Sequence, residues 1–193
     1  MKKWYVFFIC WVTWSWKWTL INWLLKENIW NLEFALSCKT REPRPGEIPG
    51  KDYVKLSFED FKKEIEDWEF LEYNFVHNQD YYWTRKKDVI DNWIEKRKNL
   101  LKEIDMLIVP HLLENMKSLR KYFSIIYLDL PINTIRERML SRGDSVDNKD
   151  YENRIESAQK EKNMKHLADF VVDATNSQEE ILREVKEFIL SKI

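Results

Sequence analysis

The N-terminal segment of this chain begins with a continuous run of apolar residues. Residues 5–10 read Tyr-Val-Phe-Phe-Ile-Cys, and a run of this length without alternation is typical of a parallel strand buried on both faces. Between Leu20 and Leu25, four apolar residues then recur at helical spacing. The order strand, loop, helix predicts the first unit of an α/β fold.

The loop between this strand and helix has the spacing of a phosphate-binding loop. Residues 11–19 read Trp-Val-Thr-Trp-Ser-Trp-Lys-Trp-Thr. With glycine at Trp11 and Trp16 the segment would be a P-loop, in which Lys17 reaches terminal phosphates and Thr19 holds Mg²⁺. Glycine is needed because successive N–H groups must curl around an anion at positive φ, and a Cβ obstructs both the curl and the anion. Taken alone, Lys-x-Thr also fits an ordinary first helical turn.

Composition supports a link between the missing glycines and the tryptophans. The chain has 3 glycines and 10 tryptophans in 193 residues, whereas average usage predicts roughly 14 glycines. We infer that most tryptophans occupy positions that suit glycine.

Length, charge and cysteine usage narrow the class of protein. A chain of 193 residues fits one domain with small insertions. The net charge of −1 gives no electrostatic basis for nucleic-acid binding. Cys10 and Cys38 lie in apolar runs without metal or redox spacing, so we expect buried, reduced thiols and a cytoplasmic location.

The tryptophan-rich N-terminus superficially resembles a signal peptide or a membrane helix. Lys17 falls near the middle of the apolar stretch 4–25, and no small-residue cleavage site follows. A membrane span needs about 20 apolar residues. We therefore expect no membrane segment, with an interfacial membrane anchor as the less favoured alternative.

The rest of the chain alternates strands and helices, with one interruption. A strand at 33–37 leads into the loop 39–50, whose Pro and Gly residues exclude helix and central strand. Short strands at 53–56 and 70–75, around a helix capped by Ser57, indicate an inserted subdomain. The remaining predicted elements are a helix 87–98, a strand 100–104, a helix 109–119, a strand 123–128, an Arg-rich helix after Pro131, a helix 151–165, a strand 170–172 and a C-terminal helix opened by a capping box at 177–180. This order predicts a doubly wound parallel sheet.

Four motifs, in order along the chain, closely resemble those of guanylate kinases. They are Ser37-x-x-x-Arg41-x-x-Arg44-Pro45-Gly46-Glu47, Gly50-Lys51-Asp52-Tyr53, Phe70-Leu71-Glu72 and Tyr81-Tyr82-Trp83-Thr84. The resemblance covers nearly the whole chain and implies a three-layer α/β fold, the P-loop nucleoside-monophosphate-kinase fold, with a central parallel sheet flanked by helices. It implies a core of residues 1–36, 85–135 and 167–193, a GMP-binding subdomain 37–84 and a helical lid 136–166.

The resemblance also implies phosphoryl transfer from ATP to GMP with Mg²⁺, by a monomer or homodimer. It assigns catalysis to Lys17, Arg138, Arg142 and Arg154. It assigns ATP binding to Trp11, Val12, Thr13, Trp14, Ser15, Trp16, Lys17, Trp18 and Thr19. It assigns GMP binding to Ser37, Arg41, Arg44, Tyr53, Glu72, Tyr82, Thr84 and Asp105, and metal binding to Thr19 and Glu103.

These implied roles are chemically sensible. Planar arginine forks at Arg41 and Arg44 suit a phosphate. The carboxylate of Glu72 can accept two hydrogen bonds from guanine N1–H and its exocyclic amine, which adenine cannot supply. The attacking phosphate oxygen is already anionic, so catalysis needs positioning and charge neutralisation rather than a strong base.

The chain departs from the family at its glycine positions. Tryptophan stands there at positions 4, 11, 14, 16, 18, 68 and 83, whereas Trp23, Trp30 and Trp93 have no such match and indicate ordinary aromatic packing. Glu103 stands where aspartate is common, and a one-residue insertion is expected near 77–80. We expect weak ATP binding, because the indoles of Trp14 and Trp16 would compete with the phosphates for space.

Two interpretations of the tryptophans remain open. The favoured one is a guanylate kinase scaffold whose glycines are replaced, by engineering or by an error in the recorded sequence, because Lys17, Thr19 and the lid arginines are retained. The alternative is a catalytically inactive module that binds a phosphorylated partner through Arg41, Arg44 and Tyr53.

Overall fold

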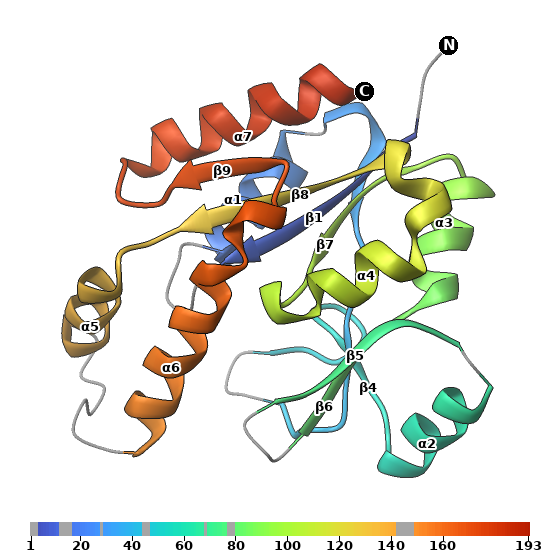
Figure 1. Cartoon of the computed structure of the whole chain (residues 1–193). Coiled ribbons are helices and arrows are strands. Elements are labelled where there is room, and N and C mark those ends of the chain that lie inside the picture. Colours follow the sequence, from blue (N-terminus) through green and yellow to red (C-terminus); the bar gives the residue numbers. More distant parts are fainter. Residues whose placement is uncertain are drawn as a thin grey trace.

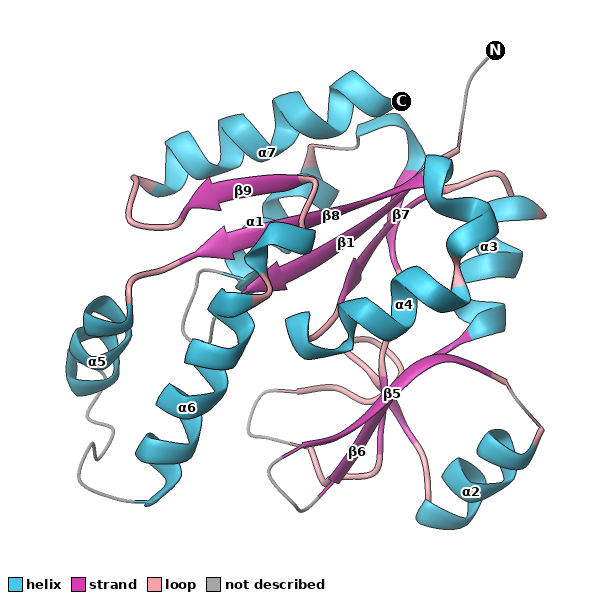
Figure 2. Cartoon of the chain, in the orientation of Figure 1, coloured by secondary structure: helices cyan, strands magenta, loops and turns pink. Residues whose placement is uncertain are grey.

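The computed structural model contains a five-stranded parallel sheet with helices on both faces and a smaller sheet below it in the view of Figure 1. It describes residues 4–11, 17–27, 29–43, 47–67, 69–76, 80–141 and 149–193. The large sheet has the order β2-β7-β1-β8-β9, and every neighbouring pair is parallel. The predicted α/β class, with its central parallel sheet flanked by helices, is confirmed (Figure 2).

The elements of this layer follow the predicted alternation. The strands are β1 (Val6–Trp11), β2 (Leu32–Phe34), β7 (Asn99–Glu103), β8 (Phe123–Asp129) and β9 (Phe170–Asp173). The helices are α1 (Lys17–Lys26), α3 (Asn92–Ile94), α4 (Val109–Asn115), α5 (Ile132–Ser141), α6 (Lys149–Asn163) and α7 (Gln178–Lys192). A π-helical turn (Lys87–Asp91) precedes α3, and 3₁₀ turns lie at Ile29–Asn31, Met106–Ile108, Lys117–Tyr122 and Lys165–Leu167.

Strand β1 is the centre of the hydrophobic core. Its residues from Val6 to Cys10 are all 0% exposed, which confirms the strand buried on both faces. It pairs with β7 so that Ile9 lies opposite Glu103, and with β8 on its other side. The carboxyl ends of β1 and β7 therefore meet at one edge of the sheet, where α/β proteins place their ligands.

The second sheet carries four strands in the order β4-β3-β6-β5. Their bounds are β3 (Cys38–Lys39), β4 (Val54–Lys55), β5 (Phe70–Val76) and β6 (Asp80–Arg85), and α2 (Phe58–Glu66) covers one face. A reciprocal capping box between Ser57 and Asp60 begins α2, as the cap at Ser57 predicted. Phe61 of α2 packs with Cys38 and Trp83 in a small core of their own.

Sequence reasoning missed two strands of this sheet. Strand β3 lies between β4 and β6, so the prediction that residues 39–50 exclude a central strand is wrong at Lys39. The strand is possible there because it ends before Pro43, where the ring would remove a ladder hydrogen bond. Strand β6 was not predicted, because its residues do not alternate between apolar and polar. The segment was identified only as the motif Tyr81-Tyr82-Trp83-Thr84.

Several predicted bounds were too long. Strand β2 ends at Phe34 rather than at residue 37, and α4 ends at Asn115 before a 3₁₀ turn continues to Tyr122. The helix expected over 87–98 ends at Ile94, and Arg97 then adopts φ 54°. A left-handed residue ends a right-handed helix and turns the chain into β7.

Both cysteines are free and buried, as predicted. Burial raises the pKa of the Cys38 thiol to about 12, and it raises that of Cys10 well above its ordinary value. Both thiols are therefore protonated and poorly reactive at neutral pH. Among the helices of the described ranges, none is long and apolar enough to span a membrane.

Candidate functional site

One face of the second sheet carries the polar residues that the sequence singled out. Side chains two residues apart on a strand point to the same face, so Tyr82 and Thr84 of β6 share one face and Trp83 points to the other. Trp83 packs on α2, which leaves the face of Tyr82 and Thr84 for polar contacts. These two residues stand about 7 Å apart along the strand.

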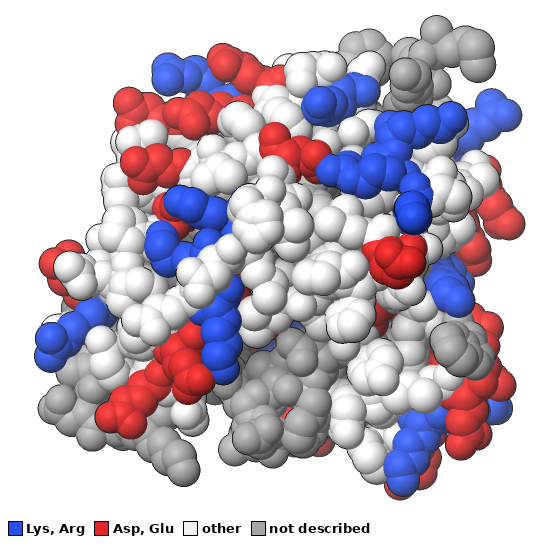
Figure 3. Space-filling model, viewed as in Figure 1, with Lys and Arg blue, Asp and Glu red and all other residues white. Residues whose placement is uncertain are grey.

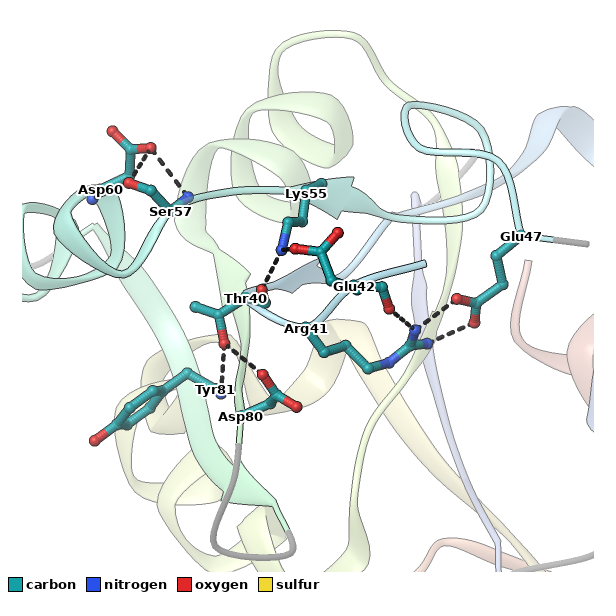
Figure 4. A network of polar contacts seen from close by, with 9 residues as sticks. All are labelled: Thr40, Arg41, Glu42, Glu47, Lys55, Ser57, Asp60, Asp80 and Tyr81. Atoms are coloured by element: carbon teal, nitrogen blue, oxygen red, sulfur yellow. Dashed lines mark hydrogen bonds and ion pairs between the residues drawn. The ribbon is translucent and has the colours of Figure 1, made fainter. Parts of the chain in front are cut away.

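At the Tyr82 end, Arg41 is held by a dense set of hydrogen bonds (Figure 4). Its Nη1 and Nη2 donate to the two carboxylate oxygens of Glu47 over 2.6 and 2.5 Å. Its Nε donates to the Tyr82 hydroxyl over 2.7 Å, and Nη1 also donates to the carbonyl of Glu42. The hydrogen bonds to Glu47 raise the pKa of Arg41 further, so the guanidinium is charged at any physiological pH. At this end of the site Arg41 binds an anionic group, which in this structure is the carboxylate of Glu47.

Two aromatic rings and a second cation surround Arg41. The Tyr53 ring lies 5.5 Å and the Tyr82 ring 5.9 Å from the guanidinium carbon. Lys39, which pairs with Tyr82 across β3 and β6, places its ammonium 5.1 and 5.4 Å from the same two rings. Lys39 was not predicted as a site residue. Its position two residues before Arg41 could have indicated a second cation near the phosphate end of the site. The Tyr53 hydroxyl is buried without a hydrogen-bond partner among the described residues.

At the Thr84 end, three predicted residues lie in one row across the sheet. Thr84 pairs with Glu72 of β5 and donates a hydrogen bond to its Oε1. Cys38 pairs with Trp83, so continuing the register by one residue sets Ser37 opposite Thr84. The row therefore brings Ser37, Thr84 and Glu72 together on one face, as a site for a single flat ligand requires.

Glu72 has an environment that opposes its own charge. Burial raises the pKa of the Glu72 carboxyl above its ordinary value, and the carboxylates of Asp105 and Glu103 raise it further. The ammonium of Lys102 and the hydrogen bond from Thr84 lower it. A desolvated carboxylate with a fixed orientation discriminates strongly between ligands that can and cannot donate to it.

The core sheet contributes a second group of polar residues from the carboxyl end of β7. Lys102 is 0% exposed and donates to Ser37 Oγ over 2.5 Å. Glu103 is buried, and its Oε1 accepts from Ser37 Oγ at 3.5 Å. Asp105 follows, and its Oδ1 accepts from the Leu107 N–H to cap a 3₁₀ turn. Ser37 thus joins the two sheets at the site.

The predicted phosphate-binding loop lies mostly outside the described residues. Trp11 is the half-buried last residue of β1, and Thr19 is exposed in the first turns of α1. Residues 12–16 lie outside the description, as do the side chains of Lys17 and Trp18. The strand, loop, helix order around the loop is confirmed by β1 and α1.

The predicted lid corresponds to the helices α5 and α6, which project from the carboxyl end of the sheet in Figure 1. Arg138 of α5 donates to the carbonyl of Ala174, 3.1 Å away. Arg44, Arg142 and the side chain of Arg154 lie outside the described residues. Asp129, at the end of β8, forms ion pairs with Lys162 and Lys165 that anchor the C-terminal part of α6 to the core.

Two tryptophans are buried within the described part of the chain, and their surroundings differ. Trp93 is buried and packs edge-on against Tyr122, with ring centroids 5.6 Å apart, which confirms ordinary aromatic packing. Trp83 is 1% exposed, and its indole N–H donates to Glu64 over 2.8 Å. The second sheet therefore accommodates an indole at position 83.

Charged residues form no large field of one sign on the face shown in Figure 3, where Lys and Arg side chains are interspersed with Asp and Glu. This agrees with the net charge of −1. Within the described ranges, no group of three or more His, Cys, Asp or Glu side chains could hold a metal ion by itself. Cation binding at this site would depend on oxygens from a ligand as well as from the protein.

Comparisons with known proteins identify relatives over nearly the whole chain. The family model described as Guanylate kinase matches residues 13–192. The guanylate kinase of Porphyromonas gingivalis is 33% identical over 180 residues, which cover 89% of this chain and 90% of that protein. The guanylate kinase of Bacteroides thetaiotaomicron is 33% identical over 183 residues, covering 91% and 85%. The crystal structure of guanylate kinase from Anaplasma phagocytophilum matches the fold with a TM-score of 0.77 at 21% identity, over 100% of this chain and 87% of that one.

Proposed function

This chain belongs to the guanylate kinase family, and from that premise we propose that it binds GMP on the second sheet and transfers to it a phosphoryl group from ATP. The proposal divides the chain into a core (residues 1–36, 85–135 and 167–193), a GMP-binding subdomain (37–84) and a lid (136–166). It also includes a cytoplasmic location, which the two buried, reduced thiols favour.

The phosphate of GMP would bind at Arg41. The guanidinium already makes a planar, bidentate contact with a carboxylate, and a phosphate fits the same two donors. The Tyr82 and Tyr53 hydroxyls and Arg44 complete the proposed phosphate site. The hydroxyl of Tyr53 is suited to this role because it is buried and has no hydrogen-bond partner among the described residues.

The guanine base would bind at the row of Ser37, Thr84 and Glu72. An ionised Glu72 can accept from N1–H and from the exocyclic amine, and Thr84 fixes the carboxylate in orientation. Adenine offers no donor at N1, so it would leave a desolvated carboxylate unpaired. Asp105 completes the proposed set of base contacts.

Mg²⁺ would enter with ATP and be held by the Thr19 hydroxyl, with Glu103 near it. These residues fit the ion, because Mg²⁺ prefers one or two protein oxygens beside phosphate oxygens and water. Glu103 ends β7, which pairs with β1, and Thr19 lies in the first turns of α1, the helix that follows β1 in the chain. When bound, the ion would neutralise charge on the transferring phosphoryl group.

The remaining residues would position the two substrates. Lys17 would contact the terminal phosphates of ATP, and Arg138, Arg142 and Arg154 of the lid would supply further positive charge. The GMP phosphate oxygen needs no general base, so the proposed rate enhancement comes from alignment, charge neutralisation and exclusion of water by the lid. The tryptophans at 11, 14 and 16 would weaken ATP binding, because their indoles would compete with the phosphates for space.

The observation that carries the proposal is the shared face of β6, where Tyr82 contacts an arginine and Thr84 contacts a carboxylate. The two ends match the phosphate and the base of one nucleotide. The test is ³¹P NMR of ATP, Mg²⁺ and GMP with the chain in which Trp11, Trp14 and Trp16 are each replaced by Gly. We expect ADP and GDP to form from ATP and GMP, and no ADP to form from ATP when AMP replaces GMP. Binding of a phosphopeptide but of neither nucleotide would instead support the inactive module.

A further inference from the structure

A lysine ammonium lies completely buried where the core sheet meets the base end of the site. Lys102 of β7 is 0% exposed, and its Nζ donates to Ser37 Oγ over 2.5 Å. Removing an ammonium from water costs several kcal/mol unless hydrogen bonds and opposite charges compensate. Because burying this ammonium is costly and Lys102 contacts a residue of the proposed base site, a role in ligand binding is expected.

The compensating carboxylates come from separate elements around Lys102. Burial raises the pKa of Glu72 on β5, and the charge of Lys102 is the strongest influence that lowers it again. Burial also raises the pKa of Asp88, in the turn before α3, and Lys102 is one of several cations, after Arg85 and Lys87, that oppose this rise. Lys102 therefore lies among the groups that face the proposed base site, and its charge favours the ionised form of Glu72.

The hydrogen bond from Lys102 restricts what Ser37 can do. A serine hydroxyl can donate one hydrogen bond and accept two, whereas an ammonium can only donate. Ser37 Oγ must therefore be the acceptor toward Lys102, and its own proton points elsewhere. The distance from Ser37 Oγ to Glu103 Oε1 is 3.5 Å, which is long for an O–H···O hydrogen bond. Ser37 would therefore donate in preference to a ligand carbonyl at normal hydrogen-bond distance.

We propose that Lys102 is a positioning residue that fixes Ser37 as a hydrogen-bond donor to the base and thereby selects a base with a carbonyl at position 6. Guanine carries a carbonyl there, and adenine carries an amino group, which a donor hydroxyl and a nearby ammonium both disfavour. Glu72 would accept hydrogen bonds from N1–H and the exocyclic amine of the base. Ser37, oriented by Lys102, would donate to the carbonyl at position 6. This inference rests on the proposed function, because it assumes that the row of Ser37, Thr84 and Glu72 binds the base.

The test compares nucleotide affinities of the full chain with those of Lys102→Met and Lys102→Arg. Isothermal titration with GMP, IMP and AMP, without ATP, gives three dissociation constants for each protein. IMP has the carbonyl and the N1–H of guanine but lacks the exocyclic amine, so it shows whether the selection remains when the amine contact to Glu72 is removed. We expect Lys102→Met to weaken GMP and IMP by about 10- to 100-fold, the range for a hydrogen bond to a charged group, and to leave AMP almost unchanged. Lys102→Arg should restore part of the loss.

Lys39→Met is the matched control, because Lys39 is also a buried lysine of the site. It lies beside Tyr53 and Tyr82 at the phosphate end, so its loss should weaken all three nucleotides by similar factors. Circular dichroism of each variant establishes that it is folded. If Lys102→Met does not fold, Lys102→Arg carries the test, since it keeps the charge but moves the donors and should still reduce the preference for IMP over AMP.

A double-mutant cycle tests whether Lys102 acts through Ser37. Ser37→Ala should weaken GMP, and adding Lys102→Met to it should cost much less than Lys102→Met alone. Equal losses for GMP and AMP in folded Lys102→Met, or full additivity with Ser37→Ala, would overturn the inference. If the unaltered chain binds GMP no better than AMP, the proposed function itself fails. If the unaltered chain prefers GMP and Lys102→Met keeps that preference, only the role of Lys102 is contradicted.

Discussion

Arg41 and Glu47 form a bidentate ion pair, with both guanidinium Nη atoms within 2.6 Å of the carboxylate oxygens. The two residues lie six positions apart in the loop between β3 and β4. The pair holds the guanidinium beside the rings of Tyr53 and Tyr82, and a phosphate would compete with Glu47 for the same donors.

Arg41→Lys is expected to raise the dissociation constant for GMP by about 10- to 100-fold, because lysine keeps the charge but loses the planar pair of donors. Isothermal titration measures the change. Arg183→Lys, at an exposed position on α7, is the matched control and should leave affinity unchanged. Equal GMP affinity in Arg41→Lys and the unaltered chain would show that the phosphate does not bind there.

Glu72→Gln should reduce the preference for GMP over AMP by about 100-fold, since the amide cannot accept both hydrogen bonds from guanine. Glu69→Gln, an exposed residue just before β5, is the control and should keep the preference. Competition titrations with the two nucleotides provide the ratio. A preference that survives Glu72→Gln would remove Glu72 from the base site.

The affinity for guanine should also depend on the charge of Glu72. Its pKa lies above the ordinary 4.5 because of burial, so the ionised form is present above the raised pKa and is lost as pH falls through it. Titration with guanosine, which has no phosphate to titrate, should show binding weakening at a pH higher than 4.5. Glu72→Gln should show no such dependence, and a matching dependence in that variant would point to another group.

The sequence predicted the fold well where apolar residues alone decide it. The run at 5–10 falls almost entirely in the central strand β1 (Val6–Trp11), because a short apolar run without polar alternation is typical of a strand buried on both faces. Ser57 and Ser177 each begin a helix with a reciprocal capping box, since that signal is local and depends on four consecutive positions.

The sequence predicted less where long-range contacts decide the structure. Ser37, Glu72 and Thr84 were identified by resemblance, but only strand pairing shows that they form one row. Lys102 was not predicted as a site residue, because its role depends on a hydrogen bond to the Ser37 hydroxyl, 65 positions away in the sequence. Trp83 was matched to a glycine position, yet its burial and its bond to Glu64 depend on α2.

Replacing Trp11, Trp14 and Trp16 by Gly should strengthen ATP binding, because it removes three indoles from the segment expected to bind the phosphates and lets the backbone adopt positive φ without a cost of about 1 to 2 kcal/mol per residue. Titration with Mg-ATP measures the gain. Trp93→Gly is the control, since Trp93 is buried against Tyr122. It should leave ATP affinity unchanged and destabilise the fold by at least about 3 kcal/mol.

An intact-mass measurement must accompany that experiment. A chain with all ten tryptophans has a mass of 23.7 kDa, and glycine at any of those positions makes it lighter. A lighter protein would support an error in the recorded sequence. A protein of full mass whose ATP affinity does not rise on replacement would contradict the account of the loop.

Glu161→Gln should stabilise the protein at alkaline pH. Burial and the carboxylate of Asp105 raise the pKa of Glu161 from 4.5 to about 8, against a hydrogen bond from Ser157 that lowers it. The folded state therefore holds a proton that the unfolded state releases, so stability falls as pH rises from 4.5 to about 8. Urea unfolding should show a loss on the order of a few kcal/mol across that window, absent in Glu161→Gln. Glu156→Gln, at an exposed position on α6, should behave like the unaltered chain.

Titration of the unaltered chain with GMP and AMP, in the absence of ATP, tests the central claim most directly. On one strand of the second sheet, Tyr82 contacts Arg41 and Thr84, two residues further on, contacts Glu72. We therefore predict saturable binding of GMP at one site per chain and binding of AMP that is at least about 100-fold weaker. Equal affinity for the two nucleotides, or no binding of GMP by a folded chain, would contradict the account.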